Sequence, residues 1–411
     1  MYRGERLFSR STLTSLIRLV PVAIALAATV YTISCGGPGF GMGAPGSGGA
    51  ASASATPTPG TGALAFVSNF SAGNVASFTR NTTTGVLKRT AITGAGAKGG
   101  PRGLAVSPGA AAGFLYVANN ADDNIYEYAV NQSSGALTPL SPPSISNGTK
   151  SGPDELAINP AGTFLFATGF NKGTVTSYSI NTSTGQLTAV KGGKVTGLTH
   201  PLGIAVDSSG AFVFVADSGS GLVYSYKIGT GGKLSPAGSP VSDVGGGGGG
   251  APAFIALDPG GNFIYVTDLN FGLIAVLQVS AGALSFGQVV PTTTSARVPM
   301  GIAYSSISGS ANFIFTANQG SSTMWSFQVQ NPGFPISPVE FGSSGEVNSP
   351  TGVVVDPQNA FLYTTNQGAG TVSRFSLAPA CFASPGAPCF VHTISTGSGS
   401  TGGPFEIILA N

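Results

Sequence analysis

An aromatic side chain recurs along the chain at nearly constant spacing, and this period restricts the possible folds more than any other feature. Each aromatic opens a tetrapeptide whose third residue is small and whose fourth is Asn, Asp or Gly, as in YVAN (116–119) and YVTD (265–268). The aromatics lie 48 to 51 residues apart and are Phe66, Tyr116, Phe166, Phe214, Tyr265, Phe315 and Tyr363. Self-similarity at such a period is typical of propellers and solenoids.

Each repeat contains further short strands around the aromatic run. Apolar residues alternate through Phe114–Ala118 and again through Ile125–Val130, with a polar turn between the two runs. A Gly-x-Leu element then opens a third run, which is degenerate in the sixth copy and is replaced in the seventh by a segment with two cysteines. Period-two alternation bounded by Asn, Asp, Ser and Gly predicts antiparallel β-strands.

A fourth short run precedes each aromatic run and starts after a proline. Proline suits the first residue of a strand because it has no N–H for the ladder to lose. Four strands in about 50 residues make one propeller blade, so we predict an all-β, seven-bladed β-propeller with four antiparallel strands per blade. The seven prolines are Pro101, Pro153, Pro201, Pro252, Pro299, Pro350 and Pro404.

The two ends of the repeat region predict how the ring closes. The first copy begins at Ala63 and has no proline-led strand, whereas Pro404 to Ala410 form a proline-led strand without a copy of its own. We expect this C-terminal strand to pair into blade one, which removes open sheet edges. The alternative, an open solenoid, leaves both terminal units incomplete.

The N-terminus is predicted to be a signal peptide spanning residues 1–35. Four arginines precede an uncharged, mostly apolar run of 16 residues, Leu19 to Ser34, which is shorter than the roughly 20 residues of a membrane span. The run ends in Thr-Ile-Ser-Cys-Gly, which resembles a bacterial lipoprotein cleavage box with Cys35 as the lipidated residue. An ordinary signal peptide and an uncleaved anchor are the alternatives.

Residues 36–62 are rich in Gly, Ala, Ser and Pro and are expected to be a flexible tether, followed by the propeller at 63–411. This organisation predicts an exported protein of the bacterial cell envelope, anchored to the membrane by its lipid, in the periplasm or at the cell surface. Cys381 and Cys389 are then an even pair in an exported domain, which favours a disulfide.

Charge and histidine content exclude several classes of function. Only 8% of residues are charged and the net charge is +2, so nucleic acid is not an expected partner. With two histidines in the whole chain, we expect neither a metal site nor a cofactor. We expect a monomer.

The residues beside the seven prolines are the candidate site, because the first strand of a propeller blade lines the central channel. They are Arg102, Asp154, Glu155, His200, Arg297, Asn348 and Glu406. Carboxylates, a histidine and two arginines suit general acid–base chemistry on a lactone and binding of its anionic product. Alternatively, they are solvated residues of the rim.

The tetrapeptides, with Phe-Leu-Tyr before them and Thr-Gly-x-Leu after them, resemble the lactonase-type seven-bladed propellers and the Tyr-Val-Thr-Asn repeat proteins over Ala63 to Ala410. The resemblance implies a hydrolase of the 6-phosphogluconolactonase type that opens a sugar lactone. Arg102, Glu155 and His200 match family positions, and Arg297 completes the tentative catalytic set. Gly103 and Leu202 stand where the family carries histidines.

Because those two histidines are absent, the expected function is a binding or scaffold module with its ligand site at the rim of the central channel. Its partner would be a small molecule, a carbohydrate or a protein. The lactonase-like hydrolase is the alternative, and a cell-surface adhesion protein is a third hypothesis. The sequence leaves open whether the protein is an enzyme.

Overall fold

The structure is a computed structural model that describes residues 63–410, apart from 97–98, 109–112, 247, 292–297, 308–311, 331–332, 344, 383–386, 398 and 400–402. The predicted signal peptide with Cys35, the tether and Arg297 therefore lie outside the described residues. Within those residues, no helix is both long and apolar enough to cross a membrane.

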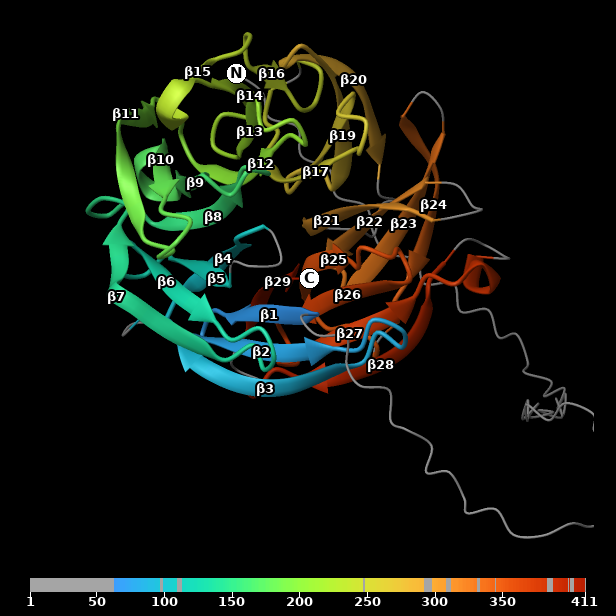
Figure 1. Cartoon of the computed structure of the whole chain (residues 1–411). Helices are drawn as coiled ribbons and strands as arrows, with labels where there is room; N and C mark the ends of the chain where they lie inside the picture. Colours follow the sequence, from blue (N-terminus) through green and yellow to red (C-terminus); the bar gives the residue numbers. More distant parts are fainter. Residues whose placement is uncertain are drawn as a thin grey trace, which may run out of the picture. The chain divides into compact units, whose positions relative to one another are not determined.

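The described chain forms seven antiparallel sheets arranged as blades around an axis, which confirms the predicted seven-bladed propeller (Figure 1). Each innermost strand contacts the innermost strands of both neighbouring blades, so the ring is continuous. The strands, from the axis outward, are β29 (Pro404–Ala410), β1 (Leu64–Asn69), β2 (Asn74–Arg80) and β3 (Leu87–Gly94) in blade 1; β4 (Pro101–Val106), β5 (Phe114–Asn119), β6 (Asn124–Val130) and β7 (Leu137–Ser146) in blade 2; β8 (Pro153–Ile158), β9 (Phe164–Gly169), β10 (Thr174–Ile180) and β11 (Leu187–Thr196) in blade 3; β12 (Pro201–Val206), β13 (Phe212–Asp217), β14 (Leu222–Ile228) and the pair β15 (Leu234–Pro236) and β16 (Val241–Ser242) in blade 4; β17 (Pro252–Leu257), β18 (Phe263–Asp268), β19 (Leu273–Ser280) and β20 (Ala283–Pro291) in blade 5; β21 (Pro299–Ser306), β22 (Asn312–Asn318), β23 (Thr323–Gln330) and β24 (Phe334–Phe341) in blade 6; and β25 (Pro350–Val355), β26 (Phe361–Asn366), β27 (Thr371–Ser376) and β28 (Cys389–Ser395) in blade 7.

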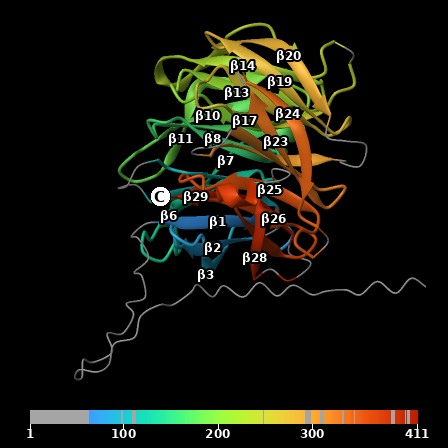
Figure 2. The same cartoon turned by 90° about the vertical axis from the view of Figure 1, so that its right-hand side faces the viewer.

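The C-terminal strand closes the ring, as predicted. Strand β29 pairs antiparallel with β1, with Ile408 opposite Phe66 and Ile407 opposite Val67, and the two strands lie side by side in both views (Figures 1 and 2). Blade 1 therefore combines the two ends of the propeller sequence, and its sheet has the same order as the others.

The Gly-x-Leu element has a packing role between blades. A Cβ at Gly185 would lie less than 3.0 Å from the ring of Phe114 in the preceding blade, and Gly85 faces Phe361 across the closure in the same way. Both glycines have positive φ, which L-residues rarely adopt. Gly333, in the degenerate sixth copy, meets Phe263 identically. The motif thus marks the places where one blade packs on the next.

The outermost strands depart most from the regular pattern. In blade 4 the outer strand is broken into β15 and β16, which both pair with β14. In blade 7 a disulfide joins Cys381 to Cys389, with 5.3 Å between the Cα atoms, as predicted. Three short 3-10 helices complete the described elements: η1 (Phe170–Lys172), η2 (Thr230–Gly232) and η3 (Pro379–Phe382).

Candidate functional site

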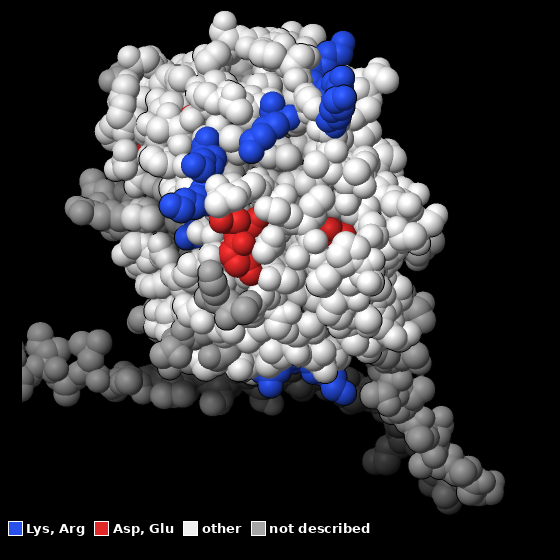
Figure 3. Space-filling model, turned by 90° about the vertical axis from the view of Figure 1, so that its left-hand side faces the viewer, with Lys and Arg blue, Asp and Glu red and all other residues white. Residues whose placement is uncertain are grey.

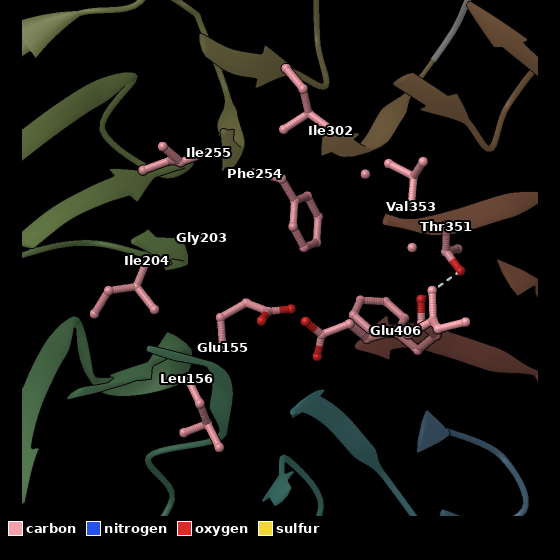
Figure 4. A pocket seen from close by; sticks show the side chains of 14 residues that line it. Glu155, Leu156, Gly203, Ile204, Phe254, Ile255, Ile302, Thr351, Val353 and Glu406 are labelled. Carbon is pink, nitrogen blue, oxygen red and sulfur yellow. Dashed lines mark hydrogen bonds between the residues drawn. The ribbon is translucent and has the colours of Figure 1, made fainter. Parts of the chain in front are cut away.

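A cavity of about 150 Å³ lies on the axis, where the first halves of the innermost strands converge. Six of the seven innermost strands contribute to its wall (Figure 4). The residues lining it are Glu155 and Leu156 of β8, Gly203 and Ile204 of β12, Phe254 and Ile255 of β17, Gly301 and Ile302 of β21, Thr351, Gly352 and Val353 of β25, and Phe405, Glu406 and Ile407 of β29.

One position on each innermost strand determines the form of the wall, namely the second residue after the proline. Four of the seven are glycines, and a Cβ on any of them would lie less than 3.0 Å from backbone atoms of the next innermost strand. Packing therefore excludes a side chain there, and only three positions project one toward the axis. In blade order the seven residues are Glu406, Gly103, Glu155, Gly203, Phe254, Gly301 and Gly352.

A bulge in the innermost strand sets the direction of the side chain at this position. The pairing of β8 with β9 shifts register between Pro153 and Leu156, which frees the Glu155 N–H from the ladder. That N–H donates to Thr168 Oγ1 at 2.9 Å, and the Glu406 N–H donates to Ser68 Oγ at 3.1 Å. Thr168 and Ser68 are both the third residue of their tetrapeptides. The hydroxyl at this place satisfies the backbone and fixes where each glutamate points.

Glu155 and Glu406 point toward one another across the axis (Figure 4). Burial raises the pKa of Glu406 to about 8, against the hydrogen bond that its carboxylate accepts from the Leu104 N–H, and the charge of Asp154 adds to the rise. Burial also raises the pKa of Glu155, and the neighbouring Glu406 and Asp154 raise it further. Two carboxyl groups placed together in a low-dielectric site keep at least one proton between them near neutral pH.

Asp154 and Arg102 form an ion pair beside this carboxyl pair, with 3.0 Å between Nη1 and Oδ2. The Arg102 guanidinium also lies 5.0 Å from the ring centre of Phe70 and 4.9 Å from that of Phe405, within cation–π range. Burial raises the pKa of Asp154, and the charge of Arg102 opposes that rise. Arg102 is thus bound to Asp154 and two aromatic rings, and it is outside the cavity wall.

The remaining predicted site residues lie elsewhere. The His200 ring stacks on Phe170 at 4.7 Å, and the Asn348 N–H donates to Asn366 Oδ1 at 3.3 Å. Neither residue lines the cavity, and Arg297 is outside the described residues. The structure therefore brings together Glu155 and Glu406, with Asp154 and Arg102 beside them. It also adds Phe254, whose sequence signal is a bulky residue at a position that is usually glycine.

Among the described residues, no group of three or more His, Cys, Asp or Glu side chains is placed to hold a metal ion. Exposed lysines occur instead in the strands and loops of blades 3 and 4. Figure 3 shows basic side chains following one another across one face of the molecule. The exposed lysines of these two blades and their loops are Lys150, Lys172, Lys191, Lys194, Lys227 and Lys233.

Solved structures share this fold at low sequence identity. A putative 6-phosphogluconolactonase from Bacteroides fragilis is 16% identical, with a TM-score of 0.70 over 88% of this chain and 100% of that one. A Lactobacillus plantarum protein is 18% identical, with a TM-score of 0.68 over 85% and 99%. The periplasmic gluconolactonase of Pseudomonas aeruginosa is 17% identical, with a TM-score of 0.67 over the same shares.

The sequence comparisons identify the family. No curated protein matches the chain. The family described as lactonase, 7-bladed beta-propeller matches residues 41–150, 110–197 and 196–381, which together cover most of the chain. The repeats, the closed ring of seven blades and this match agree, and the chain belongs to the lactonase family of seven-bladed β-propellers.

Proposed function

We propose that this protein hydrolyses a lactone in its axial cavity, with Glu155 and Glu406 as the acid–base pair. The observation that carries the proposal is that two carboxyl groups, the buried Glu155 and the partly buried Glu406, face one another and both have raised pKa values. The family match and the likeness to proteins described as lactonases support it. The hydrolase is thus better supported than the binding or scaffold module that the sequence favoured.

The proposed reaction needs one ionised and one protonated carboxyl. The ionised member removes a proton from water as the water oxygen bonds to the lactone carbonyl carbon. The bond between that carbon and the ring oxygen then breaks, and the protonated member gives its proton to the ring oxygen. The products are a hydroxyl and a carboxylic acid, which ionises in water. The pair titrates as a unit, so either glutamate can fill either role.

The missing histidine at position 103 counts less against hydrolysis than the sequence alone suggested. A Cβ at Gly103 would meet the backbone of Asp154 and Glu155 and would lie 3.0 Å from Glu155 Oε2. A histidine in that place would push against the carboxyl pair itself. Glycine at 103 therefore fits a site in which glutamates occupy the axis.

The test is hydrolysis of glucono-δ-lactone at neutral pH, with the spontaneous rate subtracted. Glu155→Gln and Glu406→Gln should each lower kcat by at least tenfold, since positioned acid–base groups contribute roughly 10²–10⁴-fold. Glu340→Gln is the matched control, because Glu340 is exposed on the outer strand β24. A rate equal to the spontaneous one, or glutamine variants as active as the control, would leave a binding module as the better account.

A further inference from the structure

We infer that the cavity accepts an uncharged, unphosphorylated lactone ring stacked on Phe254, and that it discriminates against the phosphorylated lactone. This inference rests on the proposed function, because it names the substrate class of the same site. It also separates this chain from the relatives described as putative 6-phosphogluconolactonases. Three features of the cavity support it: the charge of its wall, the partly exposed ring of Phe254 and its volume.

The described wall contains no Lys, Arg or His side chain, and its only ionisable groups are Glu155 and Glu406. Arg102 is already engaged, because its Nη1 is 3.0 Å from Asp154 Oδ2 and its guanidinium lies within cation–π range of the Phe70 and Phe405 rings. None of the exposed lysines of blades 3 and 4 lines the cavity. A phosphate dianion would leave water for a described wall that carries two carboxyl groups and no cation of its own, which is unfavourable.

Phe254 supplies what an uncharged sugar ring needs. Its side chain is partly exposed to the cavity and projects toward the carboxyl pair (Figure 4). The same position on the two adjacent innermost strands is occupied by Gly203 and Gly301, and the nearby Phe405 ring has its centre 6.4 Å from that of Phe254. The face of a sugar ring that carries C–H groups can stack on this aromatic face, while the hydroxyl groups reach the glutamates and the backbone of the glycines.

The cavity volume limits the ligand to one ring. About 150 Å³ is below the roughly 300–1,000 Å³ of pockets for drug-sized ligands. A monocyclic lactone between Phe254 and the carboxyl pair fits such a space. The anionic product formed in place of a neutral substrate would be repelled by the ionised glutamate, which favours its release.

The first experiment compares kcat/KM for glucono-δ-lactone and 6-phosphoglucono-δ-lactone at the same pH. We expect at least a tenfold preference for the uncharged lactone. A preference for the phosphorylated lactone would overturn this inference while the proposed hydrolase stands. Absence of turnover with both lactones would instead contradict the proposed function, and the inference would fall with it.

The second experiment tests whether Phe254 acts in substrate binding, by comparing the effect of its substitution on KM with the effect on kcat. Phe254→Ala should raise KM for glucono-δ-lactone at least fivefold and change kcat less, because the ring binds substrate without moving a proton. Phe254→Tyr should restore most of the affinity, and Phe254→Leu should not. Phe286→Ala is the matched control, since Phe286 is exposed on the outer strand β20 of the same blade. An unchanged KM in folded Phe254→Ala, or equal affinity with Leu and Tyr, would overturn the stacking role.

Discussion

Protonation of the axial glutamate Glu406 links the proposed chemistry to the stability of the fold. Burying a carboxyl group disfavours its charged form, so the folded protein holds the Glu406 proton more tightly than the unfolded chain does. The pKa of Glu406 is about 8, compared with an ordinary value of 4.5. The stabilisation linked to this proton is complete below about pH 4.5 and is lost as the pH rises through about 8. A proton that serves acid catalysis therefore also contributes to folding.

We accordingly expect the thermal midpoint to decrease as the pH is raised from 5 to 9. Glu406→Gln should make this decrease with pH less steep. Flattening will be partial, because burial also raises the pKa of Asp243 to about 8 and that of Glu127 to about 7. Differential scanning calorimetry across this range measures the slope, and Glu340→Gln should keep it. A Glu406→Gln slope identical to that of the unmutated protein would contradict the raised pKa of Glu406.

The sequence predicted which residues lie near the site, but it did not predict which of their side chains face the axis. The residues beside the prolines include Glu155, Glu406, Asp154 and Arg102, which do come together. His200 belongs to the same sequence pattern but stacks on Phe170 instead. His200 precedes its proline and lies outside the strand, whereas Glu155 and Glu406 are the second residue after theirs, where the bulge turns a side chain toward the axis. A one-residue shift moves a side chain to the other face of a strand, and the spacing alone does not reveal it.

Among the structural elements, predictability follows position along the blade. The aromatic strands lie between two other strands of their sheet, and the proline-led strands pack on the innermost strands of both neighbouring blades, so both kinds have a clear apolar pattern. The outer strands are edges with one exposed face, and there the pattern weakens. The interrupted outer strand of blade 4, β15 and β16, is an example. In blade 7 the outer strand β28 begins at a cysteine whose disulfide ties it to η3.

This disulfide should stabilise the outer edge of blade 7. A sequence separation of 8 residues makes a short loop, whose closure in the unfolded chain is worth about 2–3 kcal/mol. Reduction should lower the thermal midpoint by a few degrees. The double variant Cys381→Ser, Cys389→Ser should have the same thermal midpoint as the reduced protein, and adding reductant should not change it. Peptide mapping under non-reducing conditions should show Cys381 joined to Cys389, and two free thiols in protein from an oxidising compartment would also weaken the case for export.

For the molecule as a whole, the junction between blades 1 and 7 holds the ring closed. Strand β29 supplies the inner edge of blade 1. Across the junction, Arg80 pairs with Asp356 at 3.3 Å with both side chains fully buried, and the Tyr363 hydroxyl donates to the Gly85 carbonyl at 2.7 Å. The phase of the repeats predicted the strand pairing, whereas the buried ion pair joins residues 276 positions apart that no periodicity connects.

Closure and chemistry depend on the same strand, because β29 carries Glu406. A chain that lacks residues 404–411 should lose cooperative unfolding or soluble yield, since β1 would be left with an unpaired apolar edge. A synthetic peptide with the sequence of residues 404–410 should restore both stability and lactone hydrolysis. The same peptide with Glu406→Gln should restore stability alone, which separates the closing of the ring from proton transfer. An unchanged thermal midpoint in the truncated protein would refute the closure, and full hydrolysis with the glutamine peptide would remove Glu406 from the proposed mechanism.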